Sequence, residues 1–413
     1  MPLPAALRPL EQRSFRLLWS GQAVSAVGDG LAPVALAFAV LRIGGSASQL
    51  GLVLAAGVVG RVAFFLVGGV WADRLPRQLV MLASDVVRAG QQITIGLLLL
   101  TGSARVWQLI VGAVVFGAAA AFFMPATTGL LPQTVPAAGL QQANALMGLS
   151  RSSATVLGPA VSGVLVALVG PGWVFLINAM TFVVSALSLA LLRLPNRAIP
   201  PRESFLRELA AGWHELAIRR WYWLNLCSHA LYAFAIAAYF VLGPVISARY
   251  LGGASSWGLI AASLGIGSVA GGLLALRFRP SRPLVASNLM LTLGALQILA
   301  LVPPFPVLVI AAASAAGYCG LTFLNEIWSS VAQQLIPAHV MSRVDAYDSM
   351  LSTVALPIGF AVAGPAAARF GTRPTLVTAA LLIAVPSLLM VAFPVIHSVH
   401  RTAAGTIGEG ATA

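Results

Sequence analysis

Residues 68–80 read Gly-Gly-Val-Trp-Ala-Asp-Arg-Leu-Pro-Arg-Gln-Leu-Val (GGVWADRLPRQLV). Asp73, Arg74 and Arg77 cluster here, in a chain of which only 8% of the residues are charged. A long apolar run lies on each side of the cluster, and about 20 helical residues are enough to cross the hydrocarbon core of a bilayer. The stretch therefore predicts a short polar turn between two membrane-spanning helices.

The composition points in the same direction. The chain has 413 residues, of which 59% are hydrophobic, whereas a soluble domain carries about 25% charged residues. The net charge of +13 comes from 24 basic residues, all of them arginine. These arginines cluster between apolar runs, which is the pattern of membrane topology, so we expect no nucleic-acid partner. The two cysteines lie in apolar runs and provide no disulfide framework.

Apolar runs separated by short polar or Gly/Pro breaks predict an all-α membrane protein with twelve transmembrane helices. We place them at about residues 17–41, 48–72, 78–101, 105–130, 139–167, 171–193, 221–248, 255–277, 283–302, 305–334, 343–369 and 372–394.

The twelve helices divide into two pseudo-symmetric halves of six. At an offset of 201 residues, Gly158 aligns with Gly359 and Gly163 with Gly364. Internal repeats of this kind are typical of transporters that bind substrate near the bilayer midplane between the repeats.

The predicted organisation has four parts. Residues 1–193 and 221–394 are the two halves, 194–220 is a linker with a short amphipathic helix, and 395–413 is a disordered tail. Sixteen of the 24 arginines lie in segments that face the cytoplasm if the N-terminus does, and five lie outside. The bias predicts that the linker and both termini are cytoplasmic, in a cell membrane of the bacterial inner-membrane type.

Gly69, Asp73, Arg74 and Arg77 fit the signature G-x-x-x-D-R-x-x-R of the major facilitator superfamily. The segments FRLLWSGQAVSAVGDGL and NALMGLSRSSATVLGPAVSGVL resemble the branch that contains enterobactin-type siderophore exporters and macrolide-type efflux pumps. The resemblance implies the major facilitator fold. It also implies that the signature residues help to close the cytoplasmic side.

Three departures from the family pattern weaken the transfer of its mechanism. Gln78 stands where a basic residue is common, the matching loop of the second half has no acid, and the fourth span has no embedded arginine. Asp85 and Arg88 lie three residues apart on one face of the third span, so they can pair or join the cytoplasmic gate. Simple anchoring of the turn is the alternative.

Four ionisable residues lie near the middle of predicted spans: Asp29, Arg61, Arg151 and Glu326. A charge at this depth costs at least about 2.5 kcal/mol in lipid, so these side chains should face the interior of the bundle or water. One hypothesis is that Asp29 and Glu326 couple transport to protons or cations, with the arginines as charge partners. The other is that two ion pairs fix the register of the helices.

Further polar and helix-bending residues accompany these charges. The candidate substrate cavity consists of Gln22, His229, Tyr232, Tyr239, Asn325 and Trp328. The candidate bending and packing positions are Pro33, Gly158, Pro159, Gly163, Pro357, Gly359 and Gly364. Pro33 has no N–H, so the carbonyl of Asp29 loses its helical donor. Packing within the bundle is the alternative for both sets.

The function predicted from the sequence is proton-coupled export of small amphipathic molecules, drug-like or siderophore-like, by alternating access. An importer or uniporter of a metabolite, or a lipid-translocating protein, is the alternative. The sequence contains no nucleotide-binding motif and no metal-ligand or hydrolase motif, so we expect no metal, no cofactor and no enzyme activity. The expected partners are the substrate, protons and the bilayer, and the expected state is a monomer.

Overall fold

The computed structural model describes residues 5–193, 219–337, 341–402 and 405–410. Within these ranges, the side chains of residues 5–6, 65–74, 342–343, 345–347 and 349–350 are outside the description. Two compact units are present: Met1–Pro200 with Gly252–Ala262, and Pro201–Leu251 with Ser263–Ala413. Most of the predicted linker with its amphipathic helix, residues 194–218, lies outside the described residues.

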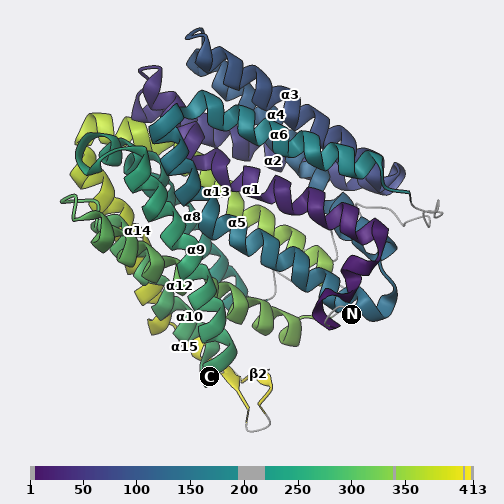
Figure 1. Cartoon of the computed structure of the whole chain (residues 1–413). Helices are drawn as coiled ribbons and strands as arrows, with labels where there is room; N and C mark the ends of the chain where they lie inside the picture. Colours follow the sequence, from purple (N-terminus) through teal and green to yellow (C-terminus); the bar gives the residue numbers. More distant parts are fainter. Residues whose placement is uncertain (1–4, 194–218, 338–340, 403–404, 411–413) are drawn as a thin grey trace. The chain divides into compact units, whose positions relative to one another are not determined.

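Figure 1 shows a chain that is almost entirely helical. The helices of the first unit are η1 (Ala5–Glu11), α1 (Arg13–Arg42), α2 (Ala47–Arg74), α3 (Arg77–Leu100), α4 (Val106–Leu130), η2 (Leu131–Gln133), η3 (Ala137–Gly139), α5 (Leu140–Val169) and α6 (Pro171–Ala190). Helix α9 (Ala254–Arg277) begins in this unit and continues in the second. The other elements of the second unit are α8 (Arg220–Ile246), the π-helical turn η4 (Ser247–Leu251), α10 (Pro283–Leu291), α11 (Leu293–Leu299), α12 (Val307–Leu335), α13 (Met341–Phe370), α14 (Thr372–Ala392), α15 (Pro394–His397), β1 (Val399–Arg401) and β2 (Ile407–Glu409).

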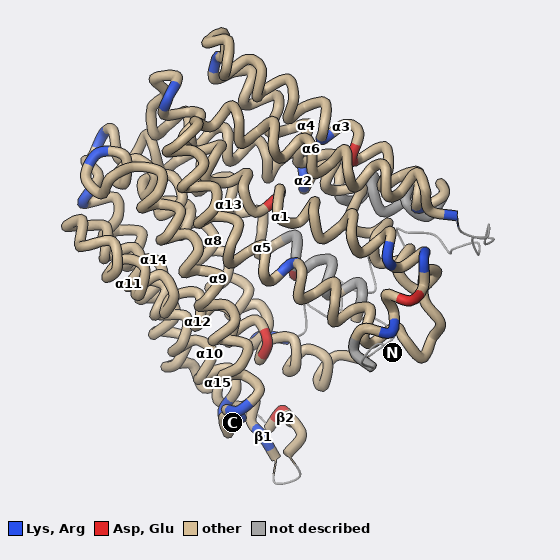
Figure 2. The backbone as a smooth tube through the Cα atoms, viewed as in Figure 1, with Lys and Arg blue, Asp and Glu red and all other residues tan. Residues whose placement is uncertain are grey.

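Within the described residues, ten helices are long and apolar enough to cross a membrane. The remaining two predicted spans correspond to α3 and to the pair α10–α11, which Thr292 interrupts. Helix α3 is more polar because it carries Arg77, Asp85 and Arg88. Figure 2 shows how sparse the charges are elsewhere and that many lie near helix ends. The predicted twelve-span layout is therefore confirmed, with one span broken into two helices.

The packing inside each unit repeats. Helix α1 packs against α5 and α6, and α8 packs against α13 and α14 in the same way. Gly60 of α2 meets the backbone of Val114 in α4, and Gly267 of α9 meets the backbone of Ala315 in α12. Because a Cβ atom at either glycine would collide with the neighbouring helix, these helices approach more closely than larger residues allow.

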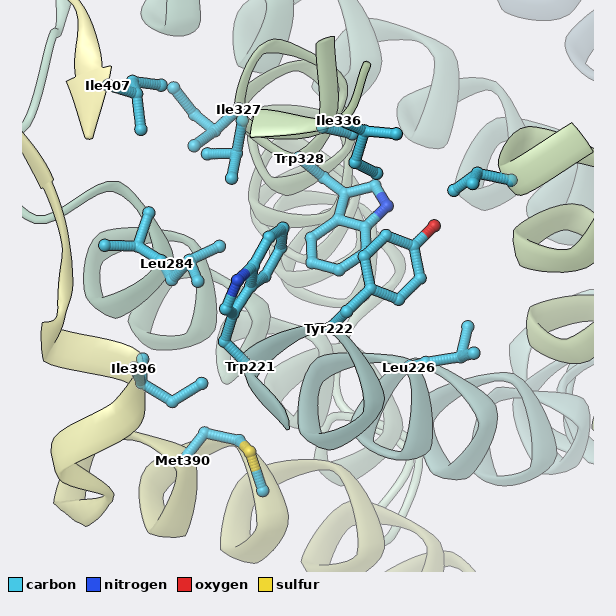
Figure 3. Packing of buried hydrophobic residues seen from close by; sticks show 14 of the residues in the cluster. Trp221, Tyr222, Leu226, Leu284, Ile327, Trp328, Ile336, Met390, Ile396 and Ile407 are labelled. Carbon is cyan, nitrogen blue, oxygen red and sulfur yellow. The ribbon is translucent and has the colours of Figure 1, made fainter. Parts of the chain in front are cut away.

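An aromatic cluster forms one end of the second unit (Figure 3). Trp328 of α12 lies 4.7 Å from Tyr222 and 5.8 Å from Trp221 of α8, measured between ring centroids. Ile396, Val399 and Ile407 from the C-terminal segment belong to the same buried cluster. The cluster therefore joins the beginning of α8 and the end of α12 to the last residues of the chain.

The C-terminal segment differs from the disordered tail expected for residues 395–413. Strands β1 and β2 form an antiparallel hairpin in which His400 faces Gly408. The Arg401 amide donates to the carbonyl of Ser281 over 2.8 Å, and the Ile407 amide donates to Oε1 of Gln334 over 2.8 Å. One bond to the turn at Ser281, one bond to the end of α12 and the burial of Ile407 order a segment whose composition alone predicts disorder.

Candidate functional site

Arg88 is the centre of a charged network inside the first unit. Its side chain is 3% exposed and donates a hydrogen bond to Oδ1 of the fully buried Asp85, one turn away on α3. Its Nη1 atom also lies 3.7 Å from Oδ2 of Asp29 on α1. One guanidinium therefore faces two carboxylates and links α1 to α3.

Two phenylalanine rings hold the guanidinium in place. The Cζ atom of Arg88 lies 4.3 Å from the ring centroid of Phe123 on α4 and 4.3 Å from that of Phe182 on α6. Such a contact is worth about 2 kcal/mol when it is shielded from water. The planar cation therefore connects four helices, α1, α3, α4 and α6, through two charges and two aromatic faces.

Asp29 is the accessible member of the network. Its side chain is 44% exposed, whereas the side chain of Asp85 is 0% exposed. Gly28 packs against Asn178 and Thr181 of α6. Gly30, on the other side of Asp29, packs against the backbone of α5 at Gly158. Helix α1 is thus held on both sides of a carboxylate that remains open to its surroundings.

The nearest charged partner of Asp29 is Arg88, which we had not predicted for it, whereas the predicted Arg61 interacts with Asp29 electrostatically from farther away. Arg61 and Arg151 are exposed, and neither forms an ion pair with a described side chain; the pair observed is with Arg88. The position of a residue along a helix gives its depth in the bilayer, but its direction around the helix axis depends on packing. Glu326 is also exposed, and it too makes no ion pair within the described ranges.

Gln22 extends the network along α1. Its Nε2 atom donates to Oγ of Ser185 on α6 over 3.2 Å, and Ser185 lies beside the Asp85 carboxylate. Gln22, which we predicted to line the cavity, is 8% exposed. It therefore belongs to the polar contact between α1 and α6.

The first two residues of α3, Arg77 and Gln78, bind carbonyl groups at the ends of two neighbouring helices. Arg77 donates from Nη1 to the carbonyl of Gly129 at the end of α4 over 2.7 Å. Gln78 donates from Nε2 to the carbonyls of Leu189 and Leu192 at the end of α6, over 2.7 and 2.8 Å. Helix ends leave such carbonyls without a partner, so both side chains act as caps. Gln78, unusual for the family pattern, has a defined role here.

The other three residues of the signature lie near the end of α2. Helix α2 extends to Arg74, but the side chains of Gly69, Asp73 and Arg74 are outside the description. Asp85 and Arg88 belong to the network with Asp29.

The other predicted cavity residues lie in the second unit, and four of the five form two groups. The His229 ring stands edge-on to Trp328 at 5.2 Å, and Nε1 of Trp328 donates to Oδ2 of Asp348 on α13 over 3.2 Å. Tyr232 and Tyr239 lie deeper along α8, where the Tyr239 hydroxyl lies 2.8 Å from Oγ of Ser314. Asn325 is exposed and belongs to neither group.

The helix-bending positions mostly lie at close helix contacts. An ideal Cβ atom on Gly158 would lie 2.6 Å from Cα of Gly30, and one on Gly163 would lie 2.9 Å from Cα of Gly258 in the same unit. Gly359 meets the backbone of α8 at Phe234. Pro33, Pro159 and Pro357 lie inside α1, α5 and α13, and Gly364 is buried in α13.

Sequence reasoning missed Phe123, Phe182, Ser185 and Asp348. The first three lie in apolar runs without any charge or motif, so nothing distinguishes them before folding. Asp348 lies near the beginning of α13, and an acid at the end of a spanning helix is expected close to the membrane surface. Among the described residues, no group of three His, Cys, Asp or Glu side chains is arranged to hold a metal ion.

The fold is that of a membrane protein built from many spanning helices. Solved structures of a nucleoside transporter, NupG, and of a bacterial homologue of the lysosomal transporter Spinster share its fold, with TM-scores of 0.72 and 0.68. The identities are 12% and 15%, and the matches cover 92% of this chain and 98% and 96% of those chains.

Residues 4–405 match the family model described as transmembrane secretion effector, so the chain belongs to that family of the major facilitator superfamily. It is 27% identical over 397 residues to the multidrug efflux pump Tap of Mycobacterium tuberculosis, covering 91% of this chain and 92% of the relative. It is 23% identical over 366 residues to macrolide efflux protein A of Streptococcus pyogenes, with coverage of 87% and 90%. The protein is therefore a transporter and not an enzyme.

Proposed function

We propose that this protein exports small amphipathic molecules across a bacterial cell membrane in exchange for protons, by alternating access. The names of its relatives support export, because they describe multidrug and macrolide efflux. The observation that carries proton coupling is the pair between half-exposed Asp29 and buried Arg88.

The geometry of this pair supports a switching role. While Asp29 is charged, Arg88 is attracted to carboxylates on both α1 and α3. A proton on Asp29 removes one attraction, so Arg88 remains bound to Asp85 on its own helix and the charged link between α1 and α3 is lost. Such a change in the charge of one group can favour one of two conformations, which is what alternating access requires.

Asp85 acts as the fixed counter-ion in this scheme. It is fully buried and contacts Arg88 directly, so the guanidinium stays neutralised when Asp29 accepts a proton. An unpaired buried cation would cost several kcal/mol.

Exposed Glu326 is a second candidate for proton uptake. Gly69, Asp73, Arg74 and Arg77 are the proposed gate at the cytoplasmic end, where Arg77 already caps α4.

Proteoliposomes with an acidic interior test the proposal, with erythromycin as the probe. An electroneutral exchange of one substrate for one proton across about one pH unit concentrates the substrate about tenfold. We expect wild-type protein to approach this ratio before protein-free liposomes have taken up appreciable erythromycin, which is a weak base and also enters an acidic lumen slowly on its own. We expect Asp29→Asn to allow only equilibration, because asparagine cannot release a proton.

Two further variants complete the comparison. Glu11→Gln changes an exposed carboxylate outside the spans and should keep the tenfold ratio. Glu326→Gln reports whether the second acid is needed. Full accumulation by Asp29→Asn would show that the carboxylate is structural, and erythromycin accumulation without proton movement would overturn the antiport mechanism.

A further inference from the structure

A cluster of uncharged hydrogen-bonding groups lies inside the second unit. It consists of Tyr232 and Tyr239 of α8, Gln297 of α11, and Ser314 and Tyr318 of α12. Gln297 lies beside the Tyr232 hydroxyl, and Tyr318 is close enough to both other tyrosines to interact electrostatically. We call these five residues the hydroxyl–amide cluster.

Two glycines make room for the cluster. An ideal Cβ atom on Gly294 would lie 2.7 Å from Cε2 of Tyr232, and one on Gly317 would lie 3.0 Å from Cδ and Nε2 of Gln297. The phenol ring and the amide therefore occupy space that larger residues on α11 and α12 would fill. The helices leave space for polar side chains, although an apolar core would cost less free energy in a membrane.

The polar groups of the cluster satisfy one another only in part. The Tyr239 hydroxyl and Oγ of Ser314 form a well-aligned bond of 2.8 Å. The Tyr232 hydroxyl and both Oε1 and Nε2 of Gln297 are buried without a hydrogen-bond partner of acceptable geometry. The Gln297 side chain is 0% exposed. Leaving such groups unpaired costs about 1–3 kcal/mol each, so the cluster is prepared for a further partner.

The position of the cluster suits a transported molecule. Tyr232 lies twelve residues from the start of α8 and Tyr318 eleven residues from the start of α12, about 17 Å along each helix and near the middle of the bilayer. Tyr318 is half-buried, so the cluster reaches the surface of its own unit at that residue. Within the described residues, both ion pairs lie in the first unit, so the two units differ in chemistry.

We infer that the hydroxyl–amide cluster is a substrate subsite that binds the neutral hydroxyl and carbonyl groups of an amphipathic molecule. Gln297 supplies both a donor and an acceptor, the tyrosine hydroxyls can do either, and the rings cover the apolar parts of the ligand. The inference rests on the proposed export function. It assigns substrate recognition to the second unit and leaves proton binding to the Arg88 network.

Purified protein in detergent tests the inference, with erythromycin as a ligand rich in hydroxyl groups and two readouts on Gln297→Leu. The leucine removes the unpaired amide at similar volume, so erythromycin binding should weaken three- to tenfold. The melting temperature without ligand should stay equal or rise, because two unpaired polar atoms have gone. Tyr232→Phe should behave in the same way.

Tyr250→Phe is the matched control, since Tyr250 is 67% exposed and lies outside the cluster; both of its readouts should equal those of the wild type. A fall in the melting temperature of Gln297→Leu with unchanged affinity would show a purely structural network and overturn the inference. The absence of erythromycin binding by the wild type would overturn it as well. If the wild type binds erythromycin but liposomes show no proton-driven accumulation, the export proposal fails and the subsite stands.

Discussion

At the scale of single residues, the effect of each charge depends on how deeply it is buried and on whether it has a partner. Asp85 is buried completely, and its stability in an apolar interior depends on Arg88. Asp29, half-exposed on α1, depends on Arg88 much less. The Arg88 guanidinium therefore stabilises the buried Asp85 permanently, whereas its pair with Asp29 can form and break. This asymmetry can be read only from the burial of the two carboxylates.

Replacement of Arg88 tests the structural half of this role. We expect Arg88→Leu to lose about 3–5 kcal/mol of unfolding free energy, because Asp85 is left as an uncompensated buried charge. Arg88→Lys should lose less, since it keeps the charge but not the flat contact with Phe123 and Phe182. Reversible unfolding in mixed micelles measures both changes.

Two comparisons make the Arg88 experiment specific. The double variant Arg88→Leu/Asp85→Leu should recover much of the lost stability, because neither charge then remains in the core. Arg61→Leu removes an exposed arginine from a neighbouring span and should change the free energy by about 0.5 kcal/mol or less. Equal losses for Arg88→Leu and Arg61→Leu would contradict the network.

At the scale of elements, the C-terminal hairpin shows how a short segment gains order from its contacts. Two strands of three residues are too short to be stable alone. Ile407 is 6% exposed within the aromatic cluster, and its amide is bound by Gln334. The hairpin therefore depends on the helices beneath it.

Ile407→Ala should release the hairpin. The loss of a buried isoleucine costs about 2 kcal/mol, which raises the open population about thirtyfold. Trypsin cleavage after Arg401, followed by mass spectrometry of the released peptide, should accelerate by this factor. Glu409→Ala, an exposed change on the same strand, should leave the rate unchanged. Equal cleavage rates for the two variants would show that Ile407 does not hold the hairpin.

At the scale of the whole molecule, the distribution of arginines predicts the orientation in the membrane. The turn between α3 and α4 should face outward, and the turn between α9 and α10 should face the cytoplasm. The second turn carries Ser281, whose carbonyl binds the C-terminal hairpin, so the hairpin is expected on the cytoplasmic side.

Labelling of single cysteines tests this orientation. With Cys227 and Cys319 replaced by alanine, Ser103→Cys should react with a membrane-impermeant maleimide in intact cells. Ser281→Cys should react only after the cells are opened. Both serines are exposed, so the difference reports sidedness and not burial. The reverse pattern would invert the topology and place both termini outside.

The sequence by itself determined the class of protein and the number of spans. Both depend on composition, on the length of apolar runs and on the turn at Asp73, which are local properties. It also identified Asp29 as a residue to explain, since a charge in an apolar run is visible without a fold. Gln297 and Phe123 gave no such signal, because uncharged residues in a span look alike until their neighbours are known.

Only the tertiary structure decided which groups meet. It placed Arg88 within 3.7 Å of Asp29, nearer than the predicted Arg61 or Arg151, and it left the amide of Gln297 without a hydrogen bond of acceptable geometry. The physical reason is that helix pattern fixes depth in the bilayer, whereas the direction of a side chain depends on how helices rotate and pack. In this protein, glycine contacts such as Gly30 with Gly158 set that packing.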